Sequence, residues 1–284
     1  MFRSPRDAIL AATLRSFALI CAAIVLPIVG FLAIEAQPIL QEVGWLAFWR
    51  DPSWNPTEGS YNLTPMLWGS LLATAGSILL ATPFGIGAAL FARYYAPPAL
   101  AKVYRQVLKL MAGIPSVIYG LWGLVVLVPL IRQVQPPGTS LLAGIAILAL
   151  MILPTIALSA DASFAKVPSA YWQGTTALAV SRRSAIWHVA FPVAKSGIFA
   201  GIILATGRAI GETMAILMVC GNVVQLPRSL FEPMRTLTAN IALEMAYATA
   251  RHRSALFVSG LLLMGAIALL VFLAETVSQD GAYE

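Results

Sequence analysis

Long apolar runs alternate along the chain with shorter polar segments that carry most of its charges. A helix needs ~20 mainly apolar residues to cross a bilayer, and six runs approach or exceed this length. They extend over residues 14–34, 65–91, 116–130, 140–159, 196–223 and 255–274. The pattern therefore predicts an all-α polytopic membrane protein, with six transmembrane helices in a single domain over residues 1–284.

The first apolar run follows basic residues, as the apolar core of a secretory signal does. Such a core holds about 7–15 apolar residues and ends at a cleavage site made of small residues. This run has spanning length and ends at Glu35. We therefore interpret it as a transmembrane helix that the protein retains.

Composition supports membrane insertion. The chain is 59% hydrophobic and only 11% charged, whereas a soluble domain has about 25% charged residues. We read the net charge of +6 by loop position, as a determinant of orientation and not as a nucleic-acid footprint. Cys21 and Cys220 both fall in apolar runs, so we expect small core residues and no disulfide framework.

Lysine and arginine are distributed unequally between the two sides of a six-span arrangement. With the N-terminus inside, eleven are cytoplasmic, namely Arg3, Arg6, Arg15, Arg93, Lys102, Arg105, Lys109, Lys166, Arg182, Arg183 and Lys195. Six are outside, namely Arg50, Arg132, Arg228, Arg235, Arg251 and Arg253. Basic loops favour the cytoplasmic side, so the sequence predicts that both termini are cytoplasmic.

Two polar segments then face outside. Residues 35–64 are acidic and turn-rich, and we expect Trp45, Trp49 and Trp54 to lie at headgroup level, where their amphipathic rings are favoured. Residues 225–253 contain four arginines and a predicted helix that extends to Met245. Their positive charge would attract an anion to the outer mouth.

The fifth apolar run contains Arg208 and Glu212. A charged side chain at the centre of a membrane helix costs about 2.5–3.5 kcal/mol and normally faces a partner or a water-filled path. The spacing of four residues places both side chains on one helical face. They are either an internal ion pair that joins helices or part of a path for an anion.

Residues 160–195 form a polar cytoplasmic segment between the fourth and fifth runs. It predicts two short helices, 171–178 and 182–189, with Ser181 as N-cap of the second. Leu178, Trp187 and other apolar side chains would face water unless the segment docks on a partner. A helix that lies on the membrane surface is the alternative.

The sequence lacks the signatures of nucleotide and metal chemistry. There is no G-x-x-x-x-G-K-[ST] stretch, so no P-loop is expected. His188 and His252 stand apart from other ligand types, which predicts solvated or loop-packing histidines. No nucleophile and base signature is found. We expect no enzymatic activity and no cofactor, with any ATP hydrolysis performed by a separate subunit.

Three separated stretches resemble the permease subunits of bacterial phosphate-specific ABC importers, most closely the PstC-type subunit. They are Gly-Ile-Pro-Ser-Val-Ile-Tyr-Gly at 113–120, the segment 167–198, and Gly-Arg-Ala-Ile-Gly-Glu-Thr-Met-Ala at 207–215, which continues to Gly221-Asn222. The third is the most specific, since the partner PstA-type subunit typically reads Gly-Glu-Thr-Ala-Pro there. Together with the six-span layout, the resemblance covers nearly the whole chain and implies the type I ABC importer permease fold.

The middle stretch corresponds to the cytoplasmic EAA loop of ABC importers. That pattern reads Glu-Ala-Ala, three residues, Gly, nine residues, then Ile-x-Leu-Pro. Val189-Ala190-Phe191-Pro192 fits its end, Ala179 occupies the glycine position, and Gln173, Gly174 and Thr175 occupy the Glu-Ala-Ala positions. The resemblance implies that this frame couples the chain to an ATPase through Gln173, Gly174, Thr175, Ala179, Ser181, Phe191 and Pro192.

The resemblance also implies that Arg208, Glu212 and Thr213 line the substrate path. A guanidinium is permanently charged and its forked donors match phosphate oxygens, while Glu212 could hold Arg208 in place and keep binding weak enough for release.

The implied partners are a PstA-like permease in a heterodimer, a cytoplasmic ATPase dimer, a periplasmic or extracellular phosphate-binding protein, inorganic phosphate and the lipid bilayer of the bacterial cytoplasmic (inner) membrane, with no nucleic acid. One alternative is a permease for another oxyanion, such as sulfate, molybdate or phosphonate. Another is a membrane sensor or scaffold that no longer transports.

Overall fold

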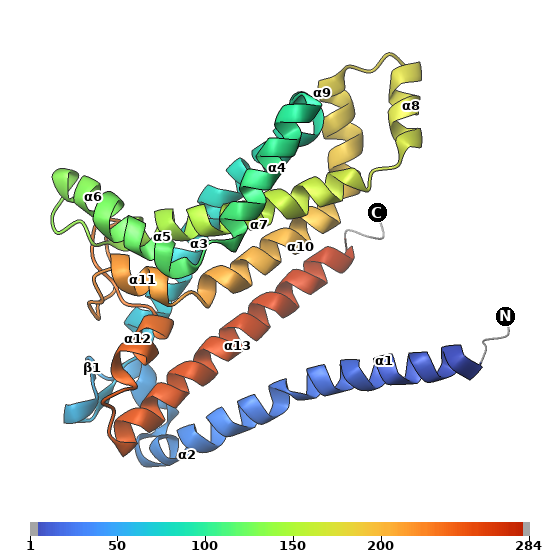
Figure 1. The fold of residues 1–284 in the computed structure, drawn as a ribbon. Coiled ribbons are helices and arrows are strands. Elements are labelled where there is room, and N and C mark those ends of the chain that lie inside the picture. The colour runs from blue at the N-terminus through green and yellow to red at the C-terminus, as the bar shows by residue number, and fades with distance from the viewer. Residues whose placement is uncertain (1–4, 281–284) are drawn as a thin grey trace. The chain divides into compact units, whose positions relative to one another are not determined.

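The computed structural model describes the backbone of residues 5–280, and the side-chain environments of residues 10–272 apart from Ala22. This part of the chain is helical except for its loops and one short hairpin (Figure 1). Six of its helical stretches are long and apolar enough to cross a membrane: 10–50, 64–95, 116–134, 141–165, 182–210 and 250–272. The prediction of an all-α protein with six spans is confirmed.

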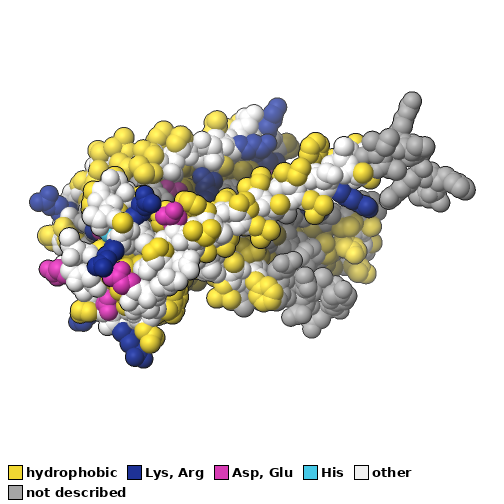
Figure 2. All heavy atoms as spheres, turned by 90° about the horizontal axis from the view of Figure 1, so that it is seen from below, with side chains coloured by type: hydrophobic (Ala, Val, Ile, Leu, Met, Phe, Trp, Pro, Cys, Tyr) yellow, Lys and Arg dark blue, Asp and Glu magenta, His cyan; other side chains and the backbone are white. Residues whose placement is uncertain are grey.

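Contacts divide the chain into two units, which are described separately. The first contains the described residues up to 62 together with 244–262, and the second contains 63–243 together with the described residues from 263 on. Hydrophobic side chains cover much of the face seen in Figure 2. Large apolar residues such as Leu79 and Leu204 are exposed, as a protein that contacts lipid requires.

The first unit contains α1 (Pro5–Ala23), α2 (Val25–Arg50), and the start of α13 (Ala250–Asp280). Its hairpin consists of β1 (Trp54–Asn55) and β2 (Ser60–Tyr61) on either side of the 3₁₀ turn η1 (Pro56–Glu58).

Helix α2 continues well past the predicted end of the first span at residue 34. It runs through Pro38 and bends at Gly44, whose φ of 74° only glycine adopts readily. Ala36 and Ile39 are fully buried in this unit, so their packing stabilises a helix that the proline alone would disfavour. The prediction of a turn-rich segment from residue 35 on was therefore wrong for residues 35–50.

A buried polar cluster fastens the hairpin to the start of α13. The Nε1 of Trp54, which is only 8% exposed, donates to Oε2 of Glu244 at 2.8 Å. The Nε2 of His252 lies 2.8 Å from the same oxygen, and the rings of Trp54 and His252 are 6.1 Å apart. Trp54 is therefore covered by the protein itself, and His252 lies on α13 against Glu244 and not on a solvated loop. Trp54 and Glu244, 190 positions apart, meet here.

The second unit contains most of the membrane helices, with π-helical turns joining several of them. Its elements are α3 (Thr64–Leu90), η2 (Phe91–Tyr95), α4 (Pro98–Gly113), α5 (Ser116–Trp122), η3 (Gly123–Leu127), α6 (Val128–Val134), α7 (Leu141–Ala165), α8 (Ser169–Ala177), α9 (Arg182–Ala185), η4 (Ile186–Ala190), α10 (Phe191–Ile210) and α11 (Met214–Val219), then most of α12 (Leu237–Glu244) and the second half of α13.

Helix α7 forms the centre of the second unit. It packs mainly against α3 and α10, and Ile147, Met151 and Ile152 are fully buried in its core. A Cβ on Gly85 of α3 would lie 2.8 Å from Cγ2 of Ile156, so this glycine allows close helix packing. The cysteines differ: Cys220 is buried, whereas Cys21 is exposed, so the prediction of a core position for Cys21 was wrong.

Candidate functional site

The predicted fifth span is interrupted between its two charged residues. Helix α10 ends at Ile210, the N–H of Gly211 donates to the carbonyl of Gly207 at 3.3 Å, and α11 begins only at Met214. The predictions of one continuous helix over 196–223 and of a shared helical face for the two charges were therefore wrong. Glycine costs about 1 kcal/mol relative to alanine inside a helix, so the two glycines weaken the helix at this point.

Glu212 is the structural centre of the break. Its Oε1 accepts a hydrogen bond from the N–H of Ala215 at 3.1 Å, which satisfies one of the free donors at the start of α11. Its own N–H donates to the carbonyl of Ala209 at 3.2 Å, and its carbonyl accepts from Oγ1 of Thr238 at 2.9 Å. Glu212 thus joins the end of α10 to the starts of α11 and α12.

Arg208 lies in the last turn of α10 and is half-buried. Within the described part of the chain, its guanidinium has no hydrogen-bond or ion-pair partner, and Glu212 does not pair with it. A cation is favoured at a helix C-terminus by the helix dipole. On α5, the hydroxyl of Tyr119 donates to the carbonyl of Met111 at 2.8 Å.

Two of the three stretches selected from the sequence meet at this break. A Cβ on Gly120 would lie 2.8 Å from Cα of Ala215 and 2.9 Å from Sδ of Met218. Only glycine lets α5 approach α11 this closely. The stretches 113–120 and 207–215 therefore build one site.

The segment after α11 folds back onto the same unit. Nε of Arg235 donates to the carbonyl of Asn222 at 2.9 Å, and its Nη1 donates to Oδ1 of Asn240 at 3.0 Å. The N–H of Leu237 donates to Oγ of Ser70 on α3 at 3.0 Å. We expected this segment to be an outer loop, and its helix is confirmed as α12. Sequence analysis missed the contact of Thr238 with Glu212, since 26 residues separate them.

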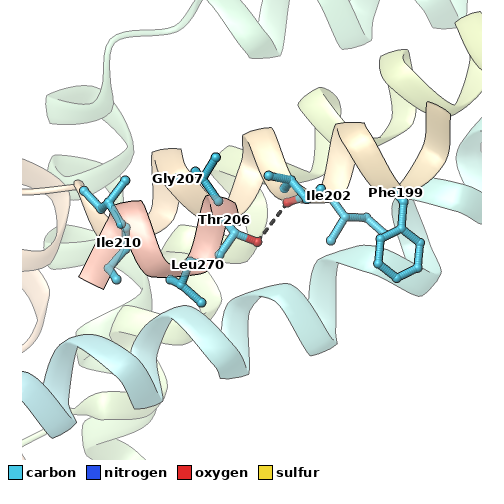
Figure 3. A pocket seen from close by; sticks show the side chains of 9 residues that line it. Phe199, Ile202, Thr206, Gly207, Ile210 and Leu270 are labelled. Atoms are coloured by element: carbon cyan, nitrogen blue, oxygen red, sulfur yellow. Dashed lines mark hydrogen bonds between the residues drawn. The ribbon is translucent and has the colours of Figure 1, made fainter. Parts of the chain in front are cut away.

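An apolar pocket lies on another face of α10 (Figure 3). It has a volume of about 180 Å³ and is lined by Phe199, Ile202, Ile203, Thr206, Gly207, Ile210, Ile267, Leu270 and Val271. The hydroxyl of Thr206 donates to the carbonyl of Ile202 at 2.8 Å, as the dashed line in Figure 3 shows. An unpaired anion in such surroundings would lose its hydration without compensation, so this pocket does not suit an anion.

The turn between α8 and α9 has a backbone conformation that suits the glycine position of the EAA pattern. Ala179 has a φ of 51°, in the left-handed region that favours glycine, and the N–H of Val180 donates to the carbonyl of Thr175 at 2.9 Å. The Oγ of Ser181 accepts from the N–H of Ser184 at 3.3 Å, which confirms the predicted N-cap. This α8–α9 hairpin projects beyond the end of α7 in Figure 1.

Aromatic residues attach the hairpin to the membrane helices. The ring of Tyr94 in η2 lies 5.0 Å from Trp172 of α8 and 5.7 Å from Phe164 of α7, and Nη1 of Arg182 donates to the Tyr94 carbonyl at 3.2 Å. Phe191 is half-buried, with its ring 6.4 Å from Phe164.

Most of the other residues selected for coupling lie on the surface. Gln173, Gly174 and Pro192 are exposed. So are Leu178 (78%) and Trp187 (51%). The predicted docking segment therefore presents apolar and polar side chains together.

The described chain is thus a bundle of membrane-spanning helices with an interrupted, charged helix and a projecting helical hairpin, as a multi-pass transport protein would have. Residues 81–279 match the family described as "Binding-protein-dependent transport system inner membrane component", and the chain belongs to this family. It is a multi-pass component of a membrane transport system.

Similar proteins include two bacterial permeases. The chain is 40% identical over 239 residues to the probable ABC transporter permease protein YqgH of Bacillus subtilis, covering 82% of this chain and 77% of that protein. It is 36% identical over 288 residues to the phosphate transport system permease protein PstC of Mesorhizobium japonicum, covering 90% and 85%.

The fold is similar to a chain of the crystal structure of a bacterial alginate ABC transporter in complex with an alginate pentasaccharide-bound periplasmic protein. The TM-score is 0.67 at 16% identity, covering 97% of this chain and 95% of that chain. This likeness supports the type I importer permease fold.

Proposed function

We propose that this chain is the PstC-type membrane permease subunit of an ATP-driven phosphate importer. The observation that carries the proposal is Arg208, a half-buried cation at the end of a membrane helix that has no hydrogen-bond or ion-pair partner in the described chain. A charge in this position normally serves a substrate path. The similarity to a protein named as a phosphate permease supports the choice of anion.

The broken helix suits this role. Transporters often place substrate sites at discontinuous membrane helices, where backbone groups and helix ends become available. Arg208 would contact the anion through its forked donors. Glu212 and Thr213 would line the same path, with Glu212 also holding the break open through its bond to Ala215.

The residues at the positions of the EAA pattern would contact a cytoplasmic ATPase dimer and would be displaced when it moves. We assign this contact to Gln173, Gly174, Thr175, Ala179, Ser181, Phe191 and Pro192. Through Tyr94 and Phe164, displacement of the α8–α9 hairpin would reach the ends of α3 and α7. A PstA-like permease would complete the path, and an external phosphate-binding protein would deliver the anion. This assembly requires a bacterial cytoplasmic membrane and cytoplasmic termini.

Two other functions fit parts of the structure. The same guanidinium would bind sulfate, molybdate or phosphonate, because all are oxyanions. A transport-inactive scaffold would keep the docking hairpin but would have no need for Arg208.

The test is uptake of radiolabelled phosphate in cells that lack this chain, with the wild type or a variant restored. Arg208→Leu should abolish uptake at normal membrane levels, and Arg208→Lys should retain a part, because a point charge replaces a fork. The control is Arg132→Gln, at an exposed arginine of α6. Absence of uptake with the wild type restored would refute the proposal, and wild-type uptake by Arg208→Leu would remove Arg208 from the substrate path. Stronger competition by sulfate or molybdate than by unlabelled phosphate would reassign the anion.

A further inference from the structure

The coupling segment contains no acidic residue. Between Asp161 and Glu212 the chain has neither aspartate nor glutamate, while it has Lys166, Arg182, Arg183, Lys195 and Arg208. Gln173, at the first position of the coupling frame, is exposed and uncharged. The α8–α9 hairpin therefore has no acid within its own segment, and its basic residues can pair with acids that a partner supplies.

The nearest acid is already neutralised. Asp161 is buried, and both its carboxylate oxygens accept hydrogen bonds from Arg93 and Arg105. On α4, which Arg105 ties to the same end of α7, Lys102 and Lys109 are exposed. Among the described residues of α4 and of the segment between α7 and α10, the accessible charges are thus positive.

A surface pocket concentrates this charge. It has a volume of about 420 Å³ and is lined by Ser181, Arg183, Ser184, Trp187 and His188. Its walls are held by local hydrogen bonds: Oγ of Ser181 accepts from the N–H of Ser184, and Nδ1 of His188 lies 3.0 Å from the Ser184 carbonyl. A guanidinium, two hydroxyls and an imidazole beside an indole ring suit a carboxylate side chain.

The hairpin suits a protein partner better than a lipid surface. A helix that lies on a membrane has a continuous apolar face and basic residues on its polar face. Helix α8 has no charged residue, and its Trp172 turns inward onto Tyr94. Leu178, the most exposed apolar residue of the hairpin, instead lies at the tip of the turn, between α8 and Arg182.

We propose that the α8–α9 hairpin docks by charge onto an acidic rim of the ATPase subunit. The surface pocket that contains Arg183 and Trp187 would receive one aspartate or glutamate of that subunit, and Leu178 would enter an apolar hollow beside it. This inference rests on the proposed function for the existence of an ATPase partner. The inference adds that the partner surface is acidic and that Arg183 is the residue that binds it.

The test measures how much cognate ATPase co-purifies with the complete permease complex in detergent, so that neither phosphate nor a bilayer is needed. Arg183→Glu should lower the retained ATPase by about tenfold or more and abolish uptake, whereas Arg183→Lys should retain it. Binding to the wild type should weaken as salt rises, because the contact is between charges. The matched control is Lys102→Glu, which reverses an exposed charge outside the pocket.

Three results would overturn the inference. If Arg183→Glu retains the ATPase as the wild type does, the pocket is not the contact. If the Arg183→Glu complex retains the ATPase but no longer binds phosphatidylglycerol vesicles, the pocket binds lipid headgroups and not the ATPase. If the wild type binds no ATPase, the proposed function itself fails. Normal ATPase binding without phosphate uptake would refute only the phosphate assignment. A second variant, Arg183→Gln, should give an intermediate loss and guards against a folding effect of the reversed charge.

Discussion

Arg105 holds both carboxylate oxygens of Asp161, with Nε 2.8 Å from Oδ2 and Nη2 3.0 Å from Oδ1. Arg93 adds a bond from Nε to Oδ1 at 3.1 Å and another from Nη2 to the Asp161 carbonyl at 3.1 Å. The hydrogen bond to Asp161 raises the pKa of Arg105 further above its usual value. This cluster joins α4 and η2 to the end of α7, directly before the coupling segment.

Asp161→Ala should destabilise the protein by about 3 kcal/mol, because two arginines lose a shared buried partner. We take the lower end of the usual range since the arginine side chains remain 31% and 28% exposed. Thermal unfolding of the purified protein in detergent measures this as a lower midpoint.

Lys102→Gln is the control for that experiment, because Lys102 is exposed on the same helix α4. Its unfolding midpoint should match that of the wild type. Equal midpoints for Asp161→Ala and Lys102→Gln would show that the cluster contributes nothing to stability.

Glu212→Ala should lower stability by about 1 kcal/mol, since the N–H of Ala215 loses its acceptor at the start of α11. Glu212→Gln keeps an oxygen in the same place and should stay near the wild type. Unfolding midpoints in detergent compare the two variants. A glutamine variant as unstable as the alanine variant would mean that the negative charge, and not the hydrogen bond, holds the break.

Gly85→Ala and Gly87→Ala should have opposite effects although both lie on α3. The new Cβ at position 85 would meet Cγ2 of Ile156 at 2.8 Å and its Cβ at 3.0 Å, whereas nothing lies within 4 Å at position 87. Overpacking costs about 1–3 kcal/mol, while alanine in place of an exposed helical glycine stabilises by about 0.5–1 kcal/mol. Chemical unfolding of both variants checks the signs, and stabilisation by both would show that α3 moves away from α7 at little cost.

Cysteines placed at the exposed Thr57 and Ser181 should report opposite sides of the membrane. In a Cys21→Ser background, Thr57→Cys should react with an impermeant thiol reagent added to intact cells, and Ser181→Cys should react only after permeabilisation. Native Cys220 is buried and should stay unlabelled. Labelling of Ser181→Cys in intact cells would invert the orientation and remove the ATPase contact.

The sequence alone determines the features that depend on local composition. Six apolar runs specify six membrane helices, because a bilayer core demands that backbone groups be satisfied within each helix. The N-cap at Ser181 also follows from neighbouring residues, since it is set within a few positions of chain. The same holds for the absence of a P-loop, which is a contiguous motif.

Tertiary structure decides what depends on distant contacts. Spacing places Arg208 and Glu212 on one helical face, yet Glu212 bonds Ala215 and Thr238 and does not face Arg208, because the helix stops between the two charges. Asp161 looks like a loop acid in the sequence, and only the fold brings it to arginines 56 and 68 residues away. The local sequence pattern determines which segments are helices. The partner of a buried charge is determined only once the helices have packed, because desolvation makes an unpaired buried group costly wherever the chain has placed it.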